Sequence, residues 1–150
     1  MKTITDDIFS GDLNSARQWL VNGAEINSRH GVAGIYPIQS AINSSKPEVL
    51  QFVISNGADV NIENGLPLLE AIDLAIDGII QNGLTWPDNT DLEMIRILLE
   101  NGADPEIINS EGARPIDIIY RYAGQSVHSM EKLISFFRPL LPNSDTLLKD

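Results

Sequence analysis

Apolar residues recur at helical spacing in three segments of the chain, and each segment ends in the same three letters. Asn-Gly-Ala occurs at residues 22–24, 56–58 and 101–103, each time after a run of apolar side chains three and four positions apart. Apolar residues at that spacing share one face of an α-helix. Glycine readily adopts the left-handed conformation in which many helices end. The pattern therefore predicts three amphipathic helices, each closed by the glycine of its motif.

Proline marks the start of a second set of helices. The segments Y-P-I-Q-S-A at 36–41, L-P-L-L-E-A at 66–71 and R-P-I-D-I-I at 114–119 each place a proline before an apolar helical pattern. Proline is tolerated in the first turn because the N–H group that it lacks would have no partner within the helix there. The chain is therefore expected to alternate helices that begin at proline with helices that end at glycine.

These landmarks in register resemble the ankyrin repeat family, which has a period of about 33 residues and the signature T-P-L-H-x-A. The segments G-A-D-V-N at 57–61 and G-A-D-P-E at 102–106 match the start of the family's hairpin. The proline motifs match the start of its first helix. The resemblance implies an all-α fold, a solenoid of stacked helix pairs joined by hairpin loops.

The resemblance covers most of the chain as a single domain over residues 1–150. The approximate repeats are 1–23, 24–57, 58–102 and 103–138, followed by a C-terminal tail at 139–150. In the first repeat, which is degenerate, the sequence predicts only the second helix. The threonine of the family signature is replaced by Tyr36, Leu66 and Arg114, and its histidine by Gln39, Leu69 and Asp117.

The third repeat departs most from the pattern. The hairpin before Pro67 is about three residues short, and the stretch from Pro67 to Gly102 is about fifteen residues too long. Residues 66–83 are read as one long helix with an apolar stripe on one face. Three acids, Glu70, Asp73 and Asp77, share another face, and we expect this arrangement to contribute nothing to the fold.

The long helix is expected to end at Gly83, and a loop containing Trp86 comes after it. Thr90 and Glu93 have the spacing of a capping box, which predicts that Thr90 is the N-cap of the next helix. Trp86 has two readings. It either folds back over Ile76 or Ile80, or it is an exposed anchor for a partner, since tryptophan is frequent among the residues that dominate binding.

The net charge of −11 is confined to the middle of the chain. Residues 59–117 hold thirteen acids and two bases, and the remaining residues hold equal numbers of each. Such a field repels nucleic acid and anionic membranes and attracts cationic partners. It also serves solubility alone, so charge by itself does not decide function.

No catalytic residue, metal ligand or cofactor is predicted. The chain has no cysteine, and its two histidines, His30 and His128, fall in different repeats. No phosphate-binding glycine motif occurs. The start of the chain lacks the apolar core of a signal peptide, and no apolar run reaches the ~20 residues of a membrane span. A cytoplasmic location is expected.

By the resemblance, hairpin tips and the inner face of each repeat's first helix form the partner-binding surface. The residues expected to contact the partner are Arg29, His30, Val32, Ile35, Glu63, Glu70, Asp73, Asp77, Trp86, Glu111, Arg114, Arg121 and Tyr122. The expected partner is another protein with a basic surface, such as a toxin, rather than nucleic acid or membrane. The free chain is expected to be a monomer.

Three functions remain open from the sequence. The first is a non-enzymatic protein-binding module, in its sharpest form an acidic bacterial immunity protein or antitoxin that masks a cationic toxin such as a nuclease. The second is a regulatory adaptor that binds an endogenous enzyme or transcription factor. The third is a hydrolase that uses Asp73 and Asp77 as a carboxylate pair.

Overall fold

The computed structural model describes residues 1–82, 88–121 and 135 of the 150-residue chain. Its helices are α1 (Ile4–Ser10), α2 (Leu13–Val21), α3 (Pro37–Asn43), α4 (Pro47–Ser55), α5 (Ile62–Asn82), α6 (Asn89–Glu100) and α7 (Asp117–Arg121). The described residues contain no strand, only an isolated antiparallel bridge between His30 and Ile35. The expected all-α class is confirmed.

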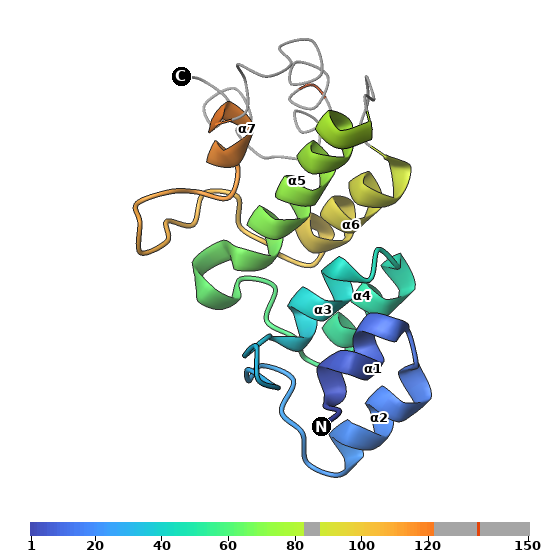
Figure 1. The fold of residues 1–150 in the computed structure, drawn as a ribbon. Helices are drawn as coiled ribbons and strands as arrows, with labels where there is room; N and C mark the ends of the chain where they lie inside the picture. Colours follow the sequence, from blue (N-terminus) through green and yellow to red (C-terminus); the bar gives the residue numbers. More distant parts are fainter. Residues whose placement is uncertain (83–87, 122–134, 136–150) are drawn as a thin grey trace.

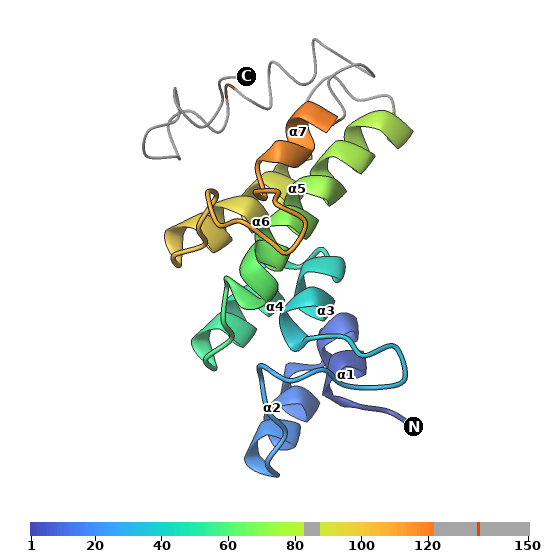
Figure 2. The same ribbon diagram turned by 90° about the vertical axis from the view of Figure 1, so that its left-hand side faces the viewer.

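Helices α1 to α6 form three consecutive pairs that stack in chain order, and α7 follows against α5 (Figure 1). Helix α1 packs on α2, α3 on α4, and α5 on α6. The odd-numbered helices also contact one another in order, α1 with α3, α3 with α5 and α5 with α7. Among the even-numbered helices, α4 contacts α6. Figure 2 shows the same stack from the side. We call α1, α3, α5 and α7 the first layer, and α2, α4 and α6 the second layer.

One continuous apolar core runs through the stack. Its largest fully buried side chains come from both layers: Ile4, Ile8, Ile38, Ile42, Leu50, Leu68, Ile72, Ile76, Ile95 and Leu98. Burial of one such side chain is worth roughly 1.5–3 kcal/mol relative to leaving it exposed. Isolated helices shorter than about 12–15 residues are marginal in water. Packing between pairs, rather than helix propensity, therefore holds the short helices in place.

The second helices end as the Asn-Gly-Ala motif predicts. Gly23, Gly57 and Gly102 have φ values of 101°, 95° and 96°. In each copy the alanine N–H donates to the carbonyl five residues earlier, at 2.9 Å for Ala24, 3.0 Å for Ala58 and 2.9 Å for Ala103. This wrapped helix end requires the left-handed glycine. The predicted helix ends are confirmed.

An asparagine after each of the first two motifs joins one helix pair to the next. The Asn27 side chain donates to the Gly57 carbonyl at 3.0 Å and accepts from the Asp59 N–H at 2.8 Å. Asn61 makes the same two bonds to Gly102 and Asp104, at 3.0 and 2.7 Å. We call these two contacts the asparagine staples. They fix the register of successive pairs at matching positions of the backbone.

The first pair is complete, whereas the sequence predicted only its second helix. Helix α1 buries Ile4 and Ile8 completely. Its start is stabilised by the Thr3 N–H, which donates to the Asp6 carboxylate at 2.7 Å. Helix α1 escaped the sequence analysis because it has neither the proline nor the glycine motif that marks the other pairs.

The predicted long helix is confirmed over residues 66–82, and residues 63–65 at the start of α5 are not helical. The prediction for the start of α6 was wrong. Asp88, not Thr90, is the N-cap, and its carboxylate accepts from the Thr90 N–H at 2.8 Å. Thr90 therefore lies in the first turn, because an equally good capping side chain precedes it by two residues. The predicted helix stop at Gly83 lies outside the described residues.

In the part of the chain that the structure describes, no helix is both long enough and apolar enough to cross a membrane.

Candidate functional site

The residues predicted to bind a partner fall into three groups along the stack. Arg29, His30, Val32 and Ile35 lie in the connection before α3. Glu63, Glu70, Asp73 and Asp77 lie at the start of α5 and along it. Glu111 and Arg114 lie in the loop before α7. Trp86 and Tyr122 fall outside the described residues, and Arg121 is described only as the last backbone position of α7.

The connection before α3 is a small hairpin with an exposed tip. The backbones of His30 and Ile35 exchange hydrogen bonds of 2.9 and 3.0 Å. The His30 ring lies 2.7 Å from the Glu25 carbonyl through its Nε2 atom, so it is half-buried against its own loop rather than presented to solvent. Val32 at the tip is fully exposed. Of this group, Val32 is the residue best placed for contact with another molecule.

Arg29 and Glu63 meet each other around Tyr36, across two connections. The Arg29 guanidinium lies over the Tyr36 ring, 4.7 Å from its centroid, and 3.5 Å from the Glu63 carboxylate. The Tyr36 hydroxyl donates to that carboxylate at 2.6 Å. This hydrogen bond, helped by the Arg29 charge, lowers the pKa of Glu63, and the same bond raises the pKa of Tyr36. The charges of Arg29 and Glu63 are therefore partly neutralised by each other within the chain.

Helix α3 is preceded by a hairpin, whereas α5 itself begins with a short left-handed turn. Glu63, Asn64 and Gly65 have φ values of 53°, 53° and 97°. A Cβ atom on Gly65 would lie 2.5 Å from a methyl carbon of Ile107 and 2.8 Å from the ring of Pro115. Residue 65 must therefore be glycine for two reasons, its backbone conformation and the close approach of the next loop.

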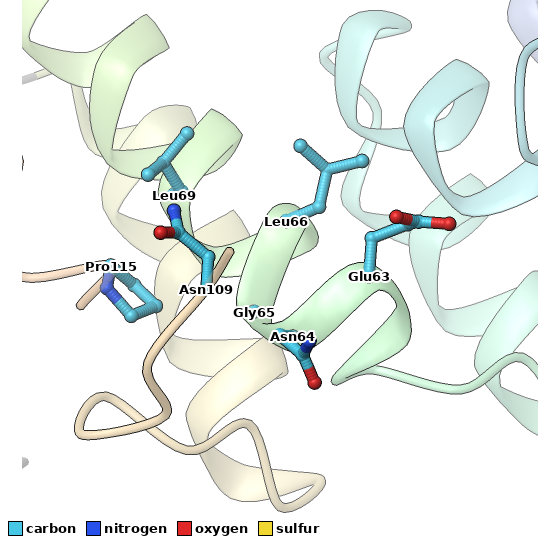
Figure 3. Close-up of a pocket in the computed structure, with 7 residues that line it drawn as sticks. All are labelled: Glu63, Asn64, Gly65, Leu66, Leu69, Asn109 and Pro115. Carbon is cyan, nitrogen blue, oxygen red and sulfur yellow. The ribbon is translucent and has the colours of Figure 1, made fainter. Parts of the chain in front are cut away.

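A small hollow lies beside this turn (Figure 3). It has about 40 Å³ of space and is lined by Glu63, Asn64, Gly65, Leu66, Leu69, Asn109 and Pro115. In Figure 3 the Glu63 carboxylate points away from the hollow, toward the preceding helix pair. The space suits a water molecule or two. It is too small for an organic ligand, so we assign it no binding role.

The acidic face of α5 is partly engaged in the fold, contrary to expectation. Glu70, Asp73 and Asp77 are all half-buried. The Gln39 amide of α3 donates to the Glu70 carboxylate at 2.7 Å, which links two first-layer helices. Burial raises the pKa of Glu70, and the negative charge of Asp73 adds to this effect. The expectation that the acids contribute nothing to the fold was wrong for Glu70, since its partner is 31 residues away in sequence.

Arg114 is committed to the start of α7. Its guanidinium donates to the Asp117 carboxylate at 2.7 Å and 3.1 Å, and its backbone N–H donates to the same group at 2.8 Å. Glu111, by contrast, is exposed in the loop. Asn109 holds that loop by accepting from the N–H groups of Glu111 and Ala113 at 2.9 and 3.1 Å.

The structure adds a groove that the sequence analysis missed. It lies between α1 and α3, has about 420 Å³ of space, and is lined by Thr5, Asp6, Phe9, Ile35, Ser40 and Asn43. Phe9 is 56% exposed, although it is a large aromatic residue on a helix. The sequence signal for an exposed Phe9 is that Ile4 and Ile8 share one face of a helix and Phe9 lies off that face. This signal depends on residues 4–10 being a helix, which the sequence did not predict.

The described residues hold no group of three or more histidine, cysteine, aspartate or glutamate side chains that could bind a metal ion. Asp73 and Asp77 lie on α5, half-buried and one helical turn apart, and neither of them lines the hollow beside Gly65 or the α1–α3 groove.

Comparison with known proteins adds no assignment. The chain matches no model of a known protein family, and no curated protein matches it at a significant level.

Proposed function

We propose that this chain is an ankyrin-repeat module that binds another protein and catalyses no reaction. Three features support the repeat assignment: stacked helix pairs, the same glycine helix end in three copies, and asparagine staples at equivalent positions. Architectures of this kind are built from supersecondary units that each contact their neighbours and present extended surfaces for partners. The first layer and the loop tips are the surface that we assign to binding.

The partner is proposed to be basic. The observation that carries this is the position of Glu70, Asp73 and Asp77, which lie on the first-layer helix α5. Burial raises the pKa of Glu70, and repulsion from the neighbouring Asp73 charge adds to that shift. A lysine or arginine from a partner would relieve this repulsion, and the long-range field would speed association.

The sharpest form of the proposal is a bacterial, cytoplasmic immunity protein or antitoxin that masks a cationic toxin. A nuclease fits this description because it needs a basic surface to approach phosphates, and an acidic module can cover that surface. A regulatory adaptor for an endogenous enzyme or transcription factor is the second candidate. A complex that buried mainly the exposed Phe9 ring would fit this candidate, because apolar contacts depend little on salt.

The test is capture of the partner by the immobilised full chain from lysate of its source, with salt elution and mass identification. The double variant Asp73→Asn with Asp77→Asn removes two first-layer charges at nearly constant shape. Its matched control is Glu93→Gln with Glu100→Gln, which removes two exposed charges from α6 in the second layer. We expect the first variant alone to lose the partner.

The identity and activity of the captured protein then separate the candidates. Release by salt of a basic enzyme, whose activity on nucleic acid or another cellular target falls when the chain is added, supports the immunity proposal. A neutral partner that survives the high-salt wash supports the adaptor. Equal loss of binding in both double variants would refute the first layer as the binding surface, and turnover of a substrate by the chain itself would refute the proposal of a binding module.

A further inference from the structure

The groove between α1 and α3 has the form of a receptor for one bulky side chain. Its floor includes Thr5 and Ser40, which are 7% and 5% exposed. Phe9 from α1 and Ile35 from the hairpin before α3 supply the apolar part of its lining. About 420 Å³ is enough for a large aliphatic or aromatic side chain.

Phe9 is not explained by the stability of the fold. The α1 residues in the core are Ile4 and Ile8, both fully buried, and Phe9 is outside that core cluster. An exposed aromatic residue that lines a concave space is the type of residue that dominates binding energy when a partner covers it. The groove therefore has an apolar anchor that a second molecule could cover.

The charge at the edge of the groove favours particular residues beside the apolar side chain of the occupant. The Asp6 carboxylate stands at its rim and is exposed. On the α3 side, Gln39 connects to Glu70, the first of the three α5 acids. The nearby Lys46 ammonium is turned to the Ser10 carbonyl at 3.0 Å. An occupant that carries positive charge beside its apolar side chain is complementary to the exposed Asp6 carboxylate.

We infer that the α1–α3 groove binds a protein segment that presents one bulky apolar side chain flanked by lysine or arginine. This inference rests on the proposed function in that the segment belongs to the proposed basic partner, and it places the anchor of the complex at Phe9. The acids of α5 then steer and orient the partner, while the groove supplies most of the lifetime of the complex, because apolar burial acts mainly on dissociation.

The probe is a phage-displayed library of random short peptides, selected on the folded full-length chain. Selected peptides are synthesised and titrated against wild type, Phe9→Gln and Val21→Gln. Val21 is the matched control because it is an exposed apolar residue at the end of a helix, on α2 in the second layer. Both variants place a good helix former at an exposed position, and thermal melts check that each remains folded.

We expect the selected peptides to share an apolar residue next to lysine or arginine. Phe9→Gln should weaken them about tenfold to a hundredfold, and Val21→Gln less than about twofold. Asp6→Asn keeps the oxygen that accepts from Thr3, so it should only slow association a few-fold, and high salt should remove this difference. Peptides that bind Phe9→Gln as well as wild type would overturn the inference.

Two further outcomes keep the inference separate from the proposed function. If the captured partner binds Phe9→Gln normally but not the Asp73→Asn, Asp77→Asn variant, the groove is overturned while the binding module stands. If no partner is captured and the peptides still require Phe9, the groove stands while the basic protein partner fails. A concentration-dependent dimer of the chain that disappears in Phe9→Gln would show that a second copy is the occupant, and would overturn the inferred basic segment.

Discussion

The connections before α3 and before α5 perform the same task with different lengths of chain. Both begin after an Asn-Gly-Ala helix end and both carry an asparagine staple. The first continues into a hairpin with an exposed tip at Val32. The second has no hairpin and leads directly into the left-handed turn over residues 63–65 with which α5 begins. The stacking of pairs therefore depends on the glycine ends and the staples, and the segment beyond them is free to vary.

The difference has a consequence for each surface. The hairpin reaches beyond the helices and forms one wall of the α1–α3 groove through Ile35. The left-handed turn is packed under the loop before α7, with Gly65 against Ile107 and Pro115. The longer connection thus contributes to the proposed binding groove, whereas the shorter one contributes to the packing within the stack. Four predictions test this comparison.

The largest effect is expected at Gly65. Gly65→Ala adds a methyl group that meets Ile107 and Pro115 and places a non-glycine residue at φ 97°. We expect a loss of about 2–5 kcal/mol in the free energy of unfolding, from overpacking and backbone strain together. Urea denaturation measures it. Gly112→Ala is the control, since Gly112 has φ 77° and open space around it, and it should lose only about 1 kcal/mol. Similar losses at both glycines would contradict the close packing of the short turn.

The two asparagine staples should contribute equally although their connections differ. Asn27→Ala and Asn61→Ala each remove two hydrogen bonds to the next pair. We expect each to cost about 1–2 kcal/mol in the free energy of unfolding. The control Asn56→Ala removes one side-chain bond to Phe52 within the same segment and should cost about half as much. A much smaller loss at Asn61 than at Asn27 would show that the short turn fixes the register by itself.

Glu63 should make the junction between the two connections sensitive to acid. Its pKa is lowered by the hydrogen bond from Tyr36, so its contribution to stability is present above its ordinary pKa of 4.5 and is lost as the pH falls through the lower folded value. Glu63→Gln and Tyr36→Phe should each be less stable than wild type near neutral pH. The difference should shrink well below pH 4.5. Unfolding curves across this range provide the measurement, and a difference that is independent of pH would count against the ionised bond.

Glu70 should show the smallest effect, with the opposite sign. Burial raises its pKa, so its ionisation costs stability above the folded pKa and costs nothing below 4.5, the ordinary value. Glu70→Gln retains an oxygen for Gln39 and removes the charge. We expect the melting temperature to rise by about 1–3 °C near neutral pH and to match wild type in acid. Glu93→Gln, at an exposed position of α6, is the control and should leave the melting temperature unchanged both near neutral pH and in acid. A fall in melting temperature would show that the Gln39 bond needs the carboxylate.

The places of several predicted contact residues in the fold could be inferred from the sequence, but their hydrogen bonds and ion pairs could not. The positions of Val32, Glu111 and the α5 acids on loops and on a first-layer helix can be inferred from the proline and glycine landmarks. That Arg29 is partly satisfied by Glu63, and Glu70 by Gln39, cannot be inferred in that way. Those pairs are about thirty residues apart, and their distance depends on the register between stacked pairs. The α1–α3 groove was missed for the same reason, since its walls belong to two different pairs.

The sequence by itself determined the local features of this protein. Glycine at the helix ends, proline at the start of α3 and the apolar period of α5 each act within a few residues, through allowed backbone angles and the 3.6-residue repeat. The other two predicted proline starts differ, because Pro67 lies inside α5 and α7 begins two residues after Pro115. Tertiary structure decided which side chains meet across pairs, why residue 65 has to be glycine, and that Phe9 is left uncovered beside a groove. These depend on how one helix pair packs against the next, and close packing of that kind is a property of the whole stack rather than of any one segment.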